Sequence, residues 1–461
     1  MMGTMLDTRV TPAGRLGLVP GPGDWSKRGV VVDVGPAGSP DSVWARDPAI
    51  LREADMSYSM WYCAYDGTRN AIMFATSTDG VSWTKHGIVL STFGTDCTPS
   101  VLKEGATYHM WFQAGTSGGN SIDYTTSPNG VNWSAPTVAL LPAGGGAWDS
   151  FAVGHPYVVR DSAGVFRMYY VGSEGTRDQI GLATSVGYTN FSRAGVAPVL
   201  SFGNGTAWDG DKVRIGAVLP PSPARQFLWT MYYAGLSGVW QLGFAYSEDG
   251  QSWTRSTRNP FLMNSVSFDS AALESAYFVN GASDVRLYYT ASDGSRVRIA
   301  LAVKNGPEFT LVPFGTFTSR IFDSGSGLTV WWRAAWNVSF PGDSAGTLWV
   351  RIGSTSAPDS SWSRWVLTLS TGPTSNIPGS PQARYIQYKI ELSAPSGTSS
   401  PEISSVTLSY GPQPPPSLQV GPSALSTLLI GLAFTGVGGA VFAVVAFVLL
   451  ERRPAAKPPI S

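Results

Sequence analysis

Charged side chains are scarce in this chain of 461 residues, at 13% of the composition, and the formal net charge is zero. A protein that binds nucleic acid through its phosphates needs a basic surface, so this balance argues against a nucleic-acid partner. The chain has three histidines and two cysteines, with no His/Cys cluster and no phosphate-binding glycine loop. We therefore expect neither a metal site nor a cofactor.

Aromatic residues are abundant instead, at 12%, and they recur. The same aromatic triplet returns five times, at intervals of about 50 to 60 residues, as Met60-Trp61-Tyr62, Met110-Trp111-Phe112, Met168-Tyr169-Tyr170, Met231-Tyr232-Tyr233 and Leu287-Tyr288-Tyr289. Alternating strand patterns surround each triplet, with about four strands in each copy. The sequence predicts an all-β protein with a five-bladed β-propeller over residues 29–312, preceded by an extension over 1–28. We expect the strand that closes the ring to come from residues 29–34.

A different β pattern follows and predicts a sandwich over residues 313–410. Its expected strands are Leu328–Ala334, Thr347–Ile352, Trp365–Thr368, Arg384–Leu392 and Ile403–Tyr410. Its tryptophans Trp331, Trp332 and Trp362 are expected mainly in the core, although exposed ones would stack on sugar rings.

The C-terminal part predicts a membrane anchor. Residues 411–423 are proline-rich and form a linker, and residues 424–450 carry no charge over a length that spans a bilayer as a helix. Residues 451–461 begin with Glu451-Arg452-Arg453 and are expected in the cytoplasm, with the bulk of the chain outside the cell membrane. Because residues 1–40 hold no apolar signal segment, we expect a start upstream of this chain. The alternative is a tail-anchored protein with its propeller in the cytoplasm.

The two cysteines, Cys63 and Cys97, fall in neighbouring repeats. They form either a disulfide or a pair of small buried hydrophobic residues.

Functional residues are expected where the repeats differ at equivalent positions on the innermost strands. We align Arg46-Asp47-Pro48, Thr98-Pro99-Ser100, Gly154-His155-Pro156, Arg214-Ile215-Gly216 and Glu274-Ser275-Ala276. The candidate ligand-binding residues are Arg46, His155 and Arg214 from these strands, Arg69 and Arg177 from hairpin turns, and Asp96. Asp96 and Asp149 also belong to a series of acids that recurs before each innermost strand, and such a series is interpreted first as structural.

Three segments together carry a family resemblance: Ala45 to Leu51, Met60-Trp61-Tyr62, and Ala75 to Trp83 with its Asp-Gly-x-x-Trp turn. Residues 30–312 resemble the five-bladed propeller superfamily of glycoside hydrolases, which includes arabinanases, β-fructosidases and mannoside phosphorylases. The resemblance implies that Asp47, just before a proline, is a general base. Where arabinanase-like members place an Asp in blade three and a Glu in blade four, this chain has His155 and Arg214.

Two hypotheses follow, both with carbohydrate as the partner. In the first, a surface-anchored glycoside hydrolase uses Asp47 as the base and Glu274 or Asp149 as the acid. In the second, a non-catalytic propeller binds a glycan or a protein. Ser361 to Trp365 and Ala383 to Tyr388 resemble segments of the jelly-roll modules found in surface proteins and sugar-active enzymes. This resemblance does not indicate a particular ligand.

Overall fold

The computed structural model describes residues 4–6, 8–10, 14–92, 94–116, 119–222, 228–265, 267–281, 284–305, 310–370, 372–411 and 426–431. These residues are β-strands, turns and loops, and the all-β class expected from the sequence is confirmed. They divide into two compact units. One contains residues 22–309, and the other combines residues 1–21 with residues 310–461.

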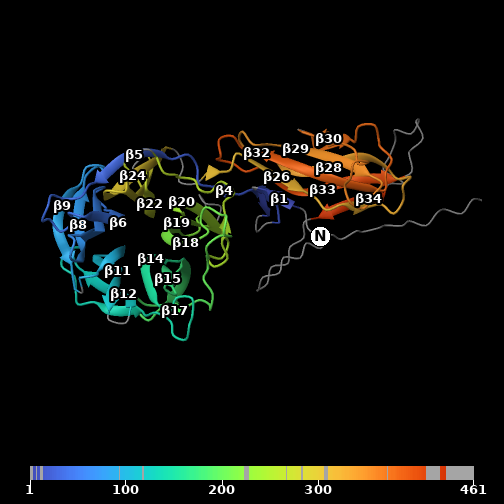
Figure 1. The fold of residues 1–461 in the computed structure, drawn as a ribbon. Coiled ribbons are helices and arrows are strands. Elements are labelled where there is room, and N and C mark those ends of the chain that lie inside the picture. Colours follow the sequence, from blue (N-terminus) through green and yellow to red (C-terminus); the bar gives the residue numbers. More distant parts are fainter. Residues whose placement is uncertain are drawn as a thin grey trace, which may run out of the picture. The chain divides into compact units, whose positions relative to one another are not determined.

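The first unit is a ring of five four-stranded blades (Figure 1). Blade one comprises β6 (Trp44–Arg52), β7 (Tyr58–Tyr65), β8 (Asn70–Ser77) and β9 (Thr84–Leu90). Blade two comprises β10 (Cys97–Glu104), β11 (Thr107–Thr116), β12 (Gly119–Ser127) and β13 (Thr137–Leu140). Blade three comprises β14 (Ala152–Arg160), β15 (Phe166–Ser173), β16 (Asp178–Ser185) and β17 (Ser192–Arg193).

The remaining two blades complete the ring. Blade four comprises β18 (Lys212–Leu219), β19 (Trp229–Ser237), β20 (Val239–Ser247) and β21 (Thr254–Arg255). Blade five comprises β22 (Ala272–Asn280), β23 (Asp284–Ser292), β24 (Val297–Asn305) and β5 (Ser26–Val32). The outer strand of blade five therefore comes from the start of the ring, as the sequence predicts, with Val32 opposite Ile299 (Figure 1).

The repeated Asp-Gly-x-x-Trp turns form hydrogen bonds that connect neighbouring blades. In blade one, the Asp79 carboxylate accepts the backbone N–H groups of Val81 and Ser82 at 2.7 and 2.8 Å. The turn glycine has a positive φ of 69° at Gly80, and its carbonyl accepts the Tyr288 hydroxyl of blade five at 2.7 Å. Equivalent contacts join Trp61 to Gly130 and Tyr169 to Gly250. The periodic aromatics thus hold one blade against the next.

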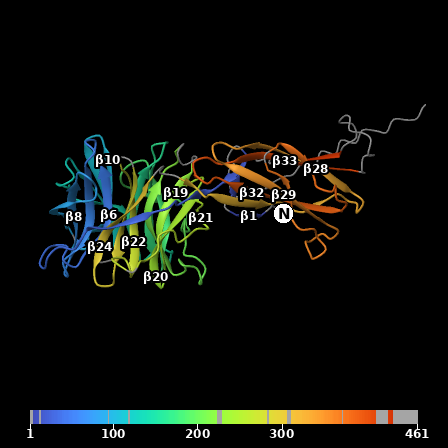
Figure 2. The same cartoon turned by 90° about the horizontal axis from the view of Figure 1, so that it is seen from above.

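The second unit is a sandwich of two six-stranded sheets, seen edge-on in Figure 2. One sheet contains β1 (Thr4–Leu6), β26 (Phe314–Thr318), β27 (Phe322–Asp323), β29 (Ala345–Gly353), β30 (Val366–Leu369) and β32 (Tyr385–Ser393). The other contains β2 (Thr8–Val10), β3 (Leu16–Leu18), β28 (Val330–Ser339), β31 (Thr374–Asn376), β33 (Glu402–Gly411) and β34 (Ser426–Gly431). A short pair, β4 (Pro20–Gly21) with β25 (Thr310–Leu311), belongs to the same unit.

The N-terminal residues differ from the separate extension expected over 1–28. Strand β1 pairs with β26, and β3 pairs with β33, so the start of the chain supplies strands to both sheets of the sandwich. These strands are three residues long, which is too short to show a period in the sequence. Trp331 and Trp362 are buried, at 1% and 7% exposure, as expected for core residues.

Within the described part of the chain, no helix is long and apolar enough to cross a membrane. Of the expected anchor over 424–450, the structure describes only residues 426–431, which form β34 against β33. Of the linker expected over 411–423, the structure describes only Gly411, the last residue of β33, and the tail over 451–461 lies outside the described residues.

Candidate functional site

The innermost strand of each blade carries an irregularity at the same position. The pairing register shifts between Arg46 and Ala49 in blade one, and at the equivalent positions of the other four blades. A β-bulge of this kind redirects the side chains around it. Four of the bulged residues have a left-handed backbone, with φ of 51° at Asp47, 50° at Thr98, 45° at His155 and 47° at Ser275.

Blade four forms a smaller bulge at Gly216. A Cβ atom there would lie 2.8 Å from the carbonyl oxygen of Tyr232 and 2.9 Å from that of Ala276. The site therefore needs a glycine, because backbone atoms of blades four and five approach it closely.

The register arranges the inner strands in three layers. The first layer contains Arg46, Cys97, Gly154, Arg214 and Glu274. The second layer contains Asp47, Thr98, His155, Ile215 and Ser275, and the third contains Pro48, Pro99, Pro156, Gly216 and Ala276. Blade two thus enters as Cys97-Thr98-Pro99, so the sequence alignment on Thr98-Pro99-Ser100 was wrong by one residue. The second and third layers, with Tyr157 and Tyr277, line a hollow in the channel.

Charged residues from neighbouring blades form a network that we call the ion cluster. It contains Arg46, Asp47, Arg214 and Glu274 from innermost strands and Asp178 from the start of β16. Arg46 donates from Nε to Asp47 Oδ2 at 2.7 Å and from Nη2 to Glu274 Oε2 at 3.3 Å. Arg214 donates to the same Glu274 oxygen at 2.9 Å and to Asp178 Oδ2 at 2.8 Å. One guanidinium thus bridges Asp47, the base expected from the sequence, and Glu274, one of the two expected acids.

Asp47 is held from several sides. The Ser275 hydroxyl donates to Asp47 Oδ1, and the backbone N–H of Asp47 donates to Thr290 Oγ1 at 2.9 Å. Burial alone would raise the pKa of Asp47, but the Arg46 guanidinium and the Ser275 hydroxyl outweigh it and hold that pKa below its usual range. Asp47 is therefore an ionised carboxylate at neutral pH.

His155 faces the same hollow as an uncharged ring. Its burial, together with the positive charges of Arg214 and Arg46, outweighs the attraction of Asp47 and lowers the pKa of His155 to about 4. A neutral imidazole offers one nitrogen as a donor and the other as an acceptor. His155 therefore adds a group that can bind a hydroxyl in either sense.

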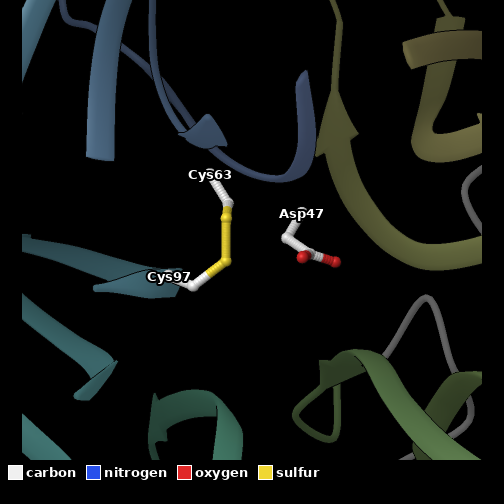
Figure 3. Close-up of side chains that lie close together, drawn as sticks. All are labelled: Asp47, Cys63 and Cys97. Atoms are coloured by element: carbon white, nitrogen blue, oxygen red, sulfur yellow. A yellow bond between two sulfur atoms is a disulfide. The ribbon is translucent and has the colours of Figure 1, made fainter. Parts of the chain in front are cut away.

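A disulfide joins Cys63 of blade one to Cys97 of blade two beside Asp47 (Figure 3). This settles the question that the sequence left open about the two cysteines. The ligand atoms of Asp47, Cys63 and Cys97 lie within 4.8 Å of one another, and no other group of three potential metal ligands occurs among the described residues. Because the two sulfurs are bonded to each other, they are not thiolate ligands, and the group does not suit a metal ion.

The recurring acids lie inside the blades and not along the hollow. Asp149 is fully buried, and its Oδ2 accepts the Tyr170 hydroxyl at 2.8 Å and Arg193 Nε at 2.7 Å. The same acid, tyrosine and cation recur as Asp41 with Tyr62 and Lys85, Asp209 with Tyr233 and Arg255, and Asp269 with Tyr289 and Lys27. These contacts tie the inner connection of a blade to its outer strand. Asp149, a candidate acid from the sequence, therefore serves blade structure.

Asp96 occupies the same place in blade two, where the tyrosine is replaced by Phe112. It is fully buried and accepts the backbone N–H of Thr92. Asp96 does not line the hollow and, like Asp149, caps the chain before an innermost strand.

The two turn arginines also lie away from the hollow. Arg69 is 3.6 Å from Asp66 of its own turn and is exposed, and the Arg177 guanidinium lies 4.4 Å from the centre of the Phe202 ring. The sequence reasoning missed Asp178, which follows Arg177. Asp178 and Trp240 take equivalent positions at the start of the third strands, where blade one has Asn70. The irregularity that identified Arg214 could have identified Asp178 as well.

Comparisons with known proteins support the fold. No protein-family model matches the chain, and no curated protein matches its sequence. Among solved structures, one described as a glycoside hydrolase matches with a TM-score of 0.51 at 15% identity, covering 61% of this chain and 92% of the other. A putative glycoside hydrolase from Parabacteroides distasonis matches with a TM-score of 0.50 at 15% identity, covering 60% and 94%.

A third match belongs to a study of the GH130 family of mannoside phosphorylases, which contains hydrolases that target β-1,2-mannosidic linkages in Candida mannan. Its TM-score is 0.50 at 16% identity, covering 66% of this chain and 94% of the other. The five-bladed propeller of residues 22–309 is therefore similar in fold to solved structures described as glycoside hydrolases. At this level of identity the likeness concerns the fold alone.

Proposed function

We propose that the propeller channel binds carbohydrate without cleaving it. Sugars present hydroxyl groups that donate and accept hydrogen bonds, and they present apolar ring faces that stack on aromatic side chains. The ion cluster offers carboxylate and guanidinium groups, and His155 adds a neutral imidazole. Trp240 lies 4.5 Å from the Arg214 guanidinium, and Trp44 stacks on Tyr65 at 4.1 Å, so indole rings accompany the polar groups.

The bridge made by Arg46 favours binding over hydrolysis. Inverting hydrolysis needs two carboxyl groups about 6.5–9.5 Å apart on opposite sides of the scissile bond, one to activate water and one to donate a proton. Here the Arg46 guanidinium occupies the space between Asp47 and Glu274. The Glu274 oxygen in this bridge accepts hydrogen bonds from two arginines, so it is already occupied as an acceptor.

A second candidate function is glycoside hydrolysis with Asp47 as the base and Glu274 as the acid. It is favoured by the position of Asp47, which sits at the bulge of blade one, is ionised, and matches the base of the resembling family. This function requires that a bound sugar displace Arg46 from Glu274.

The proposed setting is the outer face of a cell membrane. The uncharged part of the sequence that continues beyond β34 to residue 450 and the basic residues after it support a C-terminal anchor with an internal tail. The Cys63–Cys97 disulfide supports an oxidising compartment for the propeller. A protease-protection assay on intact cells tests this setting, because an internal propeller would be shielded from added protease.

The test of the channel uses the full chain in detergent with a panel of plant, microbial and host-type oligosaccharides. Both binding and released reducing sugar are measured. We expect binding without release, and about tenfold weaker binding for Asp47→Asn and Glu274→Gln because each removes a charged acceptor. The matched control is Asp55→Asn, at the exposed β6–β7 turn of the same blade, which should bind like the unchanged protein.

Two results would overturn the binding proposal. Sugar release that disappears in Asp47→Asn would establish the second candidate, a glycosidase. An absence of binding to every sugar would turn attention to a protein partner for the channel.

A further inference from the structure

One face of the sandwich carries an ordered array of indole rings and cations. On β29 the residues Leu348 and Val350 are buried, so by strand alternation Thr347, Trp349 and Arg351 lie on the opposite, solvent-facing side. On β32 the buried Ile390 and Leu392 place Gln387, Lys389 and Glu391 on that same side.

The two strands bring these side chains directly opposite one another. The register pairs Thr347 with Glu391, Trp349 with Lys389, and Arg351 with Gln387. Such cross-strand neighbours interact with each other, so the array is set by the sheet itself and not by a mobile loop.

Cations and indoles alternate across this face. Lys389 Nζ lies 5.3 Å from the centre of the Trp349 ring and 5.4 Å from that of Trp365. The Arg351 guanidinium lies 4.6 Å from Trp365 and 5.5 Å from Trp362. At these distances each cation is attracted to the ring faces, which holds the charged groups in place.

The two cations differ in their partners. Lys389 is neutralised by Glu391, whose Oε1 lies 2.6 Å from the Lys389 nitrogen. Arg351 donates from Nε and Nη2 to the amide oxygen of Gln387 at 2.9 and 2.6 Å, and no carboxylate pairs with it among the described residues. This face therefore holds a fixed guanidinium whose charge is not balanced.

We propose that this indole–cation face (Trp349, Arg351, Trp365, Gln387 and Lys389) is a second carbohydrate site, and that it takes sugars bearing a carboxylate, such as uronic acids. A guanidinium binds a carboxylate through parallel hydrogen bonds, while the half-buried indoles suit the apolar ring face of a sugar. Gln387 is buried and bonds both Arg351 and the Ser319 carbonyl, so its role is to hold the guanidinium in place. The exposed Leu367 opposite Trp349 extends the apolar part of this face onto β30. This site is distinct from the channel, and the proposal does not depend on the function proposed for the channel.

The test measures binding of the full chain to a fluorescent oligomer of galacturonic acid. The matched probe is the methyl ester of the same oligomer, which keeps the chain and removes the charge. We expect the acid to bind at least about tenfold more tightly than the ester. Arg351→Gln should lower affinity for the acid about tenfold, and Arg351→Lys should lower it less, because it keeps the charge but not the planar fork.

The control variant is Arg333→Gln, an exposed arginine on β28 in the opposite sheet, which should leave binding unchanged. Circular dichroism checks that each variant is folded. Equal affinity for acid and ester, unchanged binding in a folded Arg351→Gln, or no binding at all would overturn the proposal. Equal binding of an oligoglutamate peptide would also overturn it, by showing an acidic-peptide surface. Binding of neutral sugars and the effect of Asp47→Asn test the channel. The proposal for the channel and the proposal for the indole–cation face can therefore be overturned independently.

Discussion

Glu274, on the innermost strand of blade five, accepts a hydrogen bond from Arg46 of blade one at 3.3 Å, although 228 residues separate them. The same carboxylate oxygen accepts Arg214 of blade four. One side chain thus ties together three blades at the seam where the ring closes. Binding and stability are therefore coupled in the ion cluster, and variants must be assessed for both.

Replacing Arg46 should destabilise the propeller. In Arg46→Gln, Asp47 and Glu274 lose the cation between them, and breaking a partly buried ion pair from one side costs about 2–3 kcal/mol. Urea denaturation measures the change in the free energy of unfolding. Arg69→Gln serves as the control and should change it by less than about 0.5 kcal/mol, since Arg69 is exposed and pairs only within its turn. Equal effects of the two substitutions would contradict the bridging role.

The state of His155 predicts a dependence of stability on pH. The folded chain lowers the pKa of His155 from 6.5 to about 4, so in this interval the unfolded chain binds a proton that the folded chain does not. The stability contributed by neutral His155 is complete above pH 6.5 and is lost as the pH falls toward 4. The lowered pKa of Asp47 acts in the same direction at more acidic pH.

We expect the difference in unfolding free energy between pH 7 and pH 4.5 to be smaller by about 2 kcal/mol in His155→Gln than in the unchanged protein. Denaturant titrations at the two pH values measure it. His86→Gln, on the exposed outer strand β9, is the matched control. If both variants retain the full pH effect, His155 is not its source.

Reduction of the disulfide should loosen the junction of blades one and two. The bond closes a segment with a sequence separation of 34, and a cross-link of that span stabilises by about 3–4 kcal/mol when it restricts the unfolded chain. Unfolding with and without a reducing agent should differ by this amount. The double variant Cys63→Ser/Cys97→Ser should be as unstable as the reduced protein and indifferent to reductant, and a reductant effect that persists in it would have another origin.

The buried tyrosines should be needed for blade stability. Tyr170→Phe removes the hydroxyl that donates to Asp149 and leaves this buried carboxylate with one partner fewer, at a cost of about 1–2 kcal/mol. Tyr65→Phe is the control, because the Tyr65 hydroxyl bonds an exposed turn. Thermal unfolding should separate the two, while sugar binding by folded Tyr170→Phe should stay unchanged. A loss of sugar binding without a loss of stability would show that Asp149 has a role in function.

The propeller fold was predictable because the pattern that produces a blade recurs five times in the sequence. The aromatic triplets and glycine turns repeat in the chain because each blade packs against the next in the same way, and the ring-closing strand followed from the shortness of the last repeat. The short N-terminal strands were not predictable. Their pairing with β26 and β33 depends on partners more than 300 residues away and on no local pattern.

The candidate site was predictable in part. Arg46, Asp47, His155, Arg214 and Glu274 break a regular position, and the structure brings them together. Asp178 was missed because it begins the third strand of its blade, whereas the repeats were aligned on their innermost strands. That Arg46 bridges two carboxylates could not be predicted from the sequence, because the bridge depends on the register of blades one and five, which are neighbours in the ring but far apart in the chain.

The discontinuous sandwich sets an order of events during synthesis. Strands β1 and β3 leave the ribosome before residues 22–309, whereas their partners β26 and β33 are made only after residue 310. Strand β5 likewise waits for β24. A growing chain therefore carries unpaired strand edges until β24 has been made, and the sandwich is completed later still. A chain that stops before β24 would leave both units incomplete, with exposed strand edges of the kind that chaperones shield.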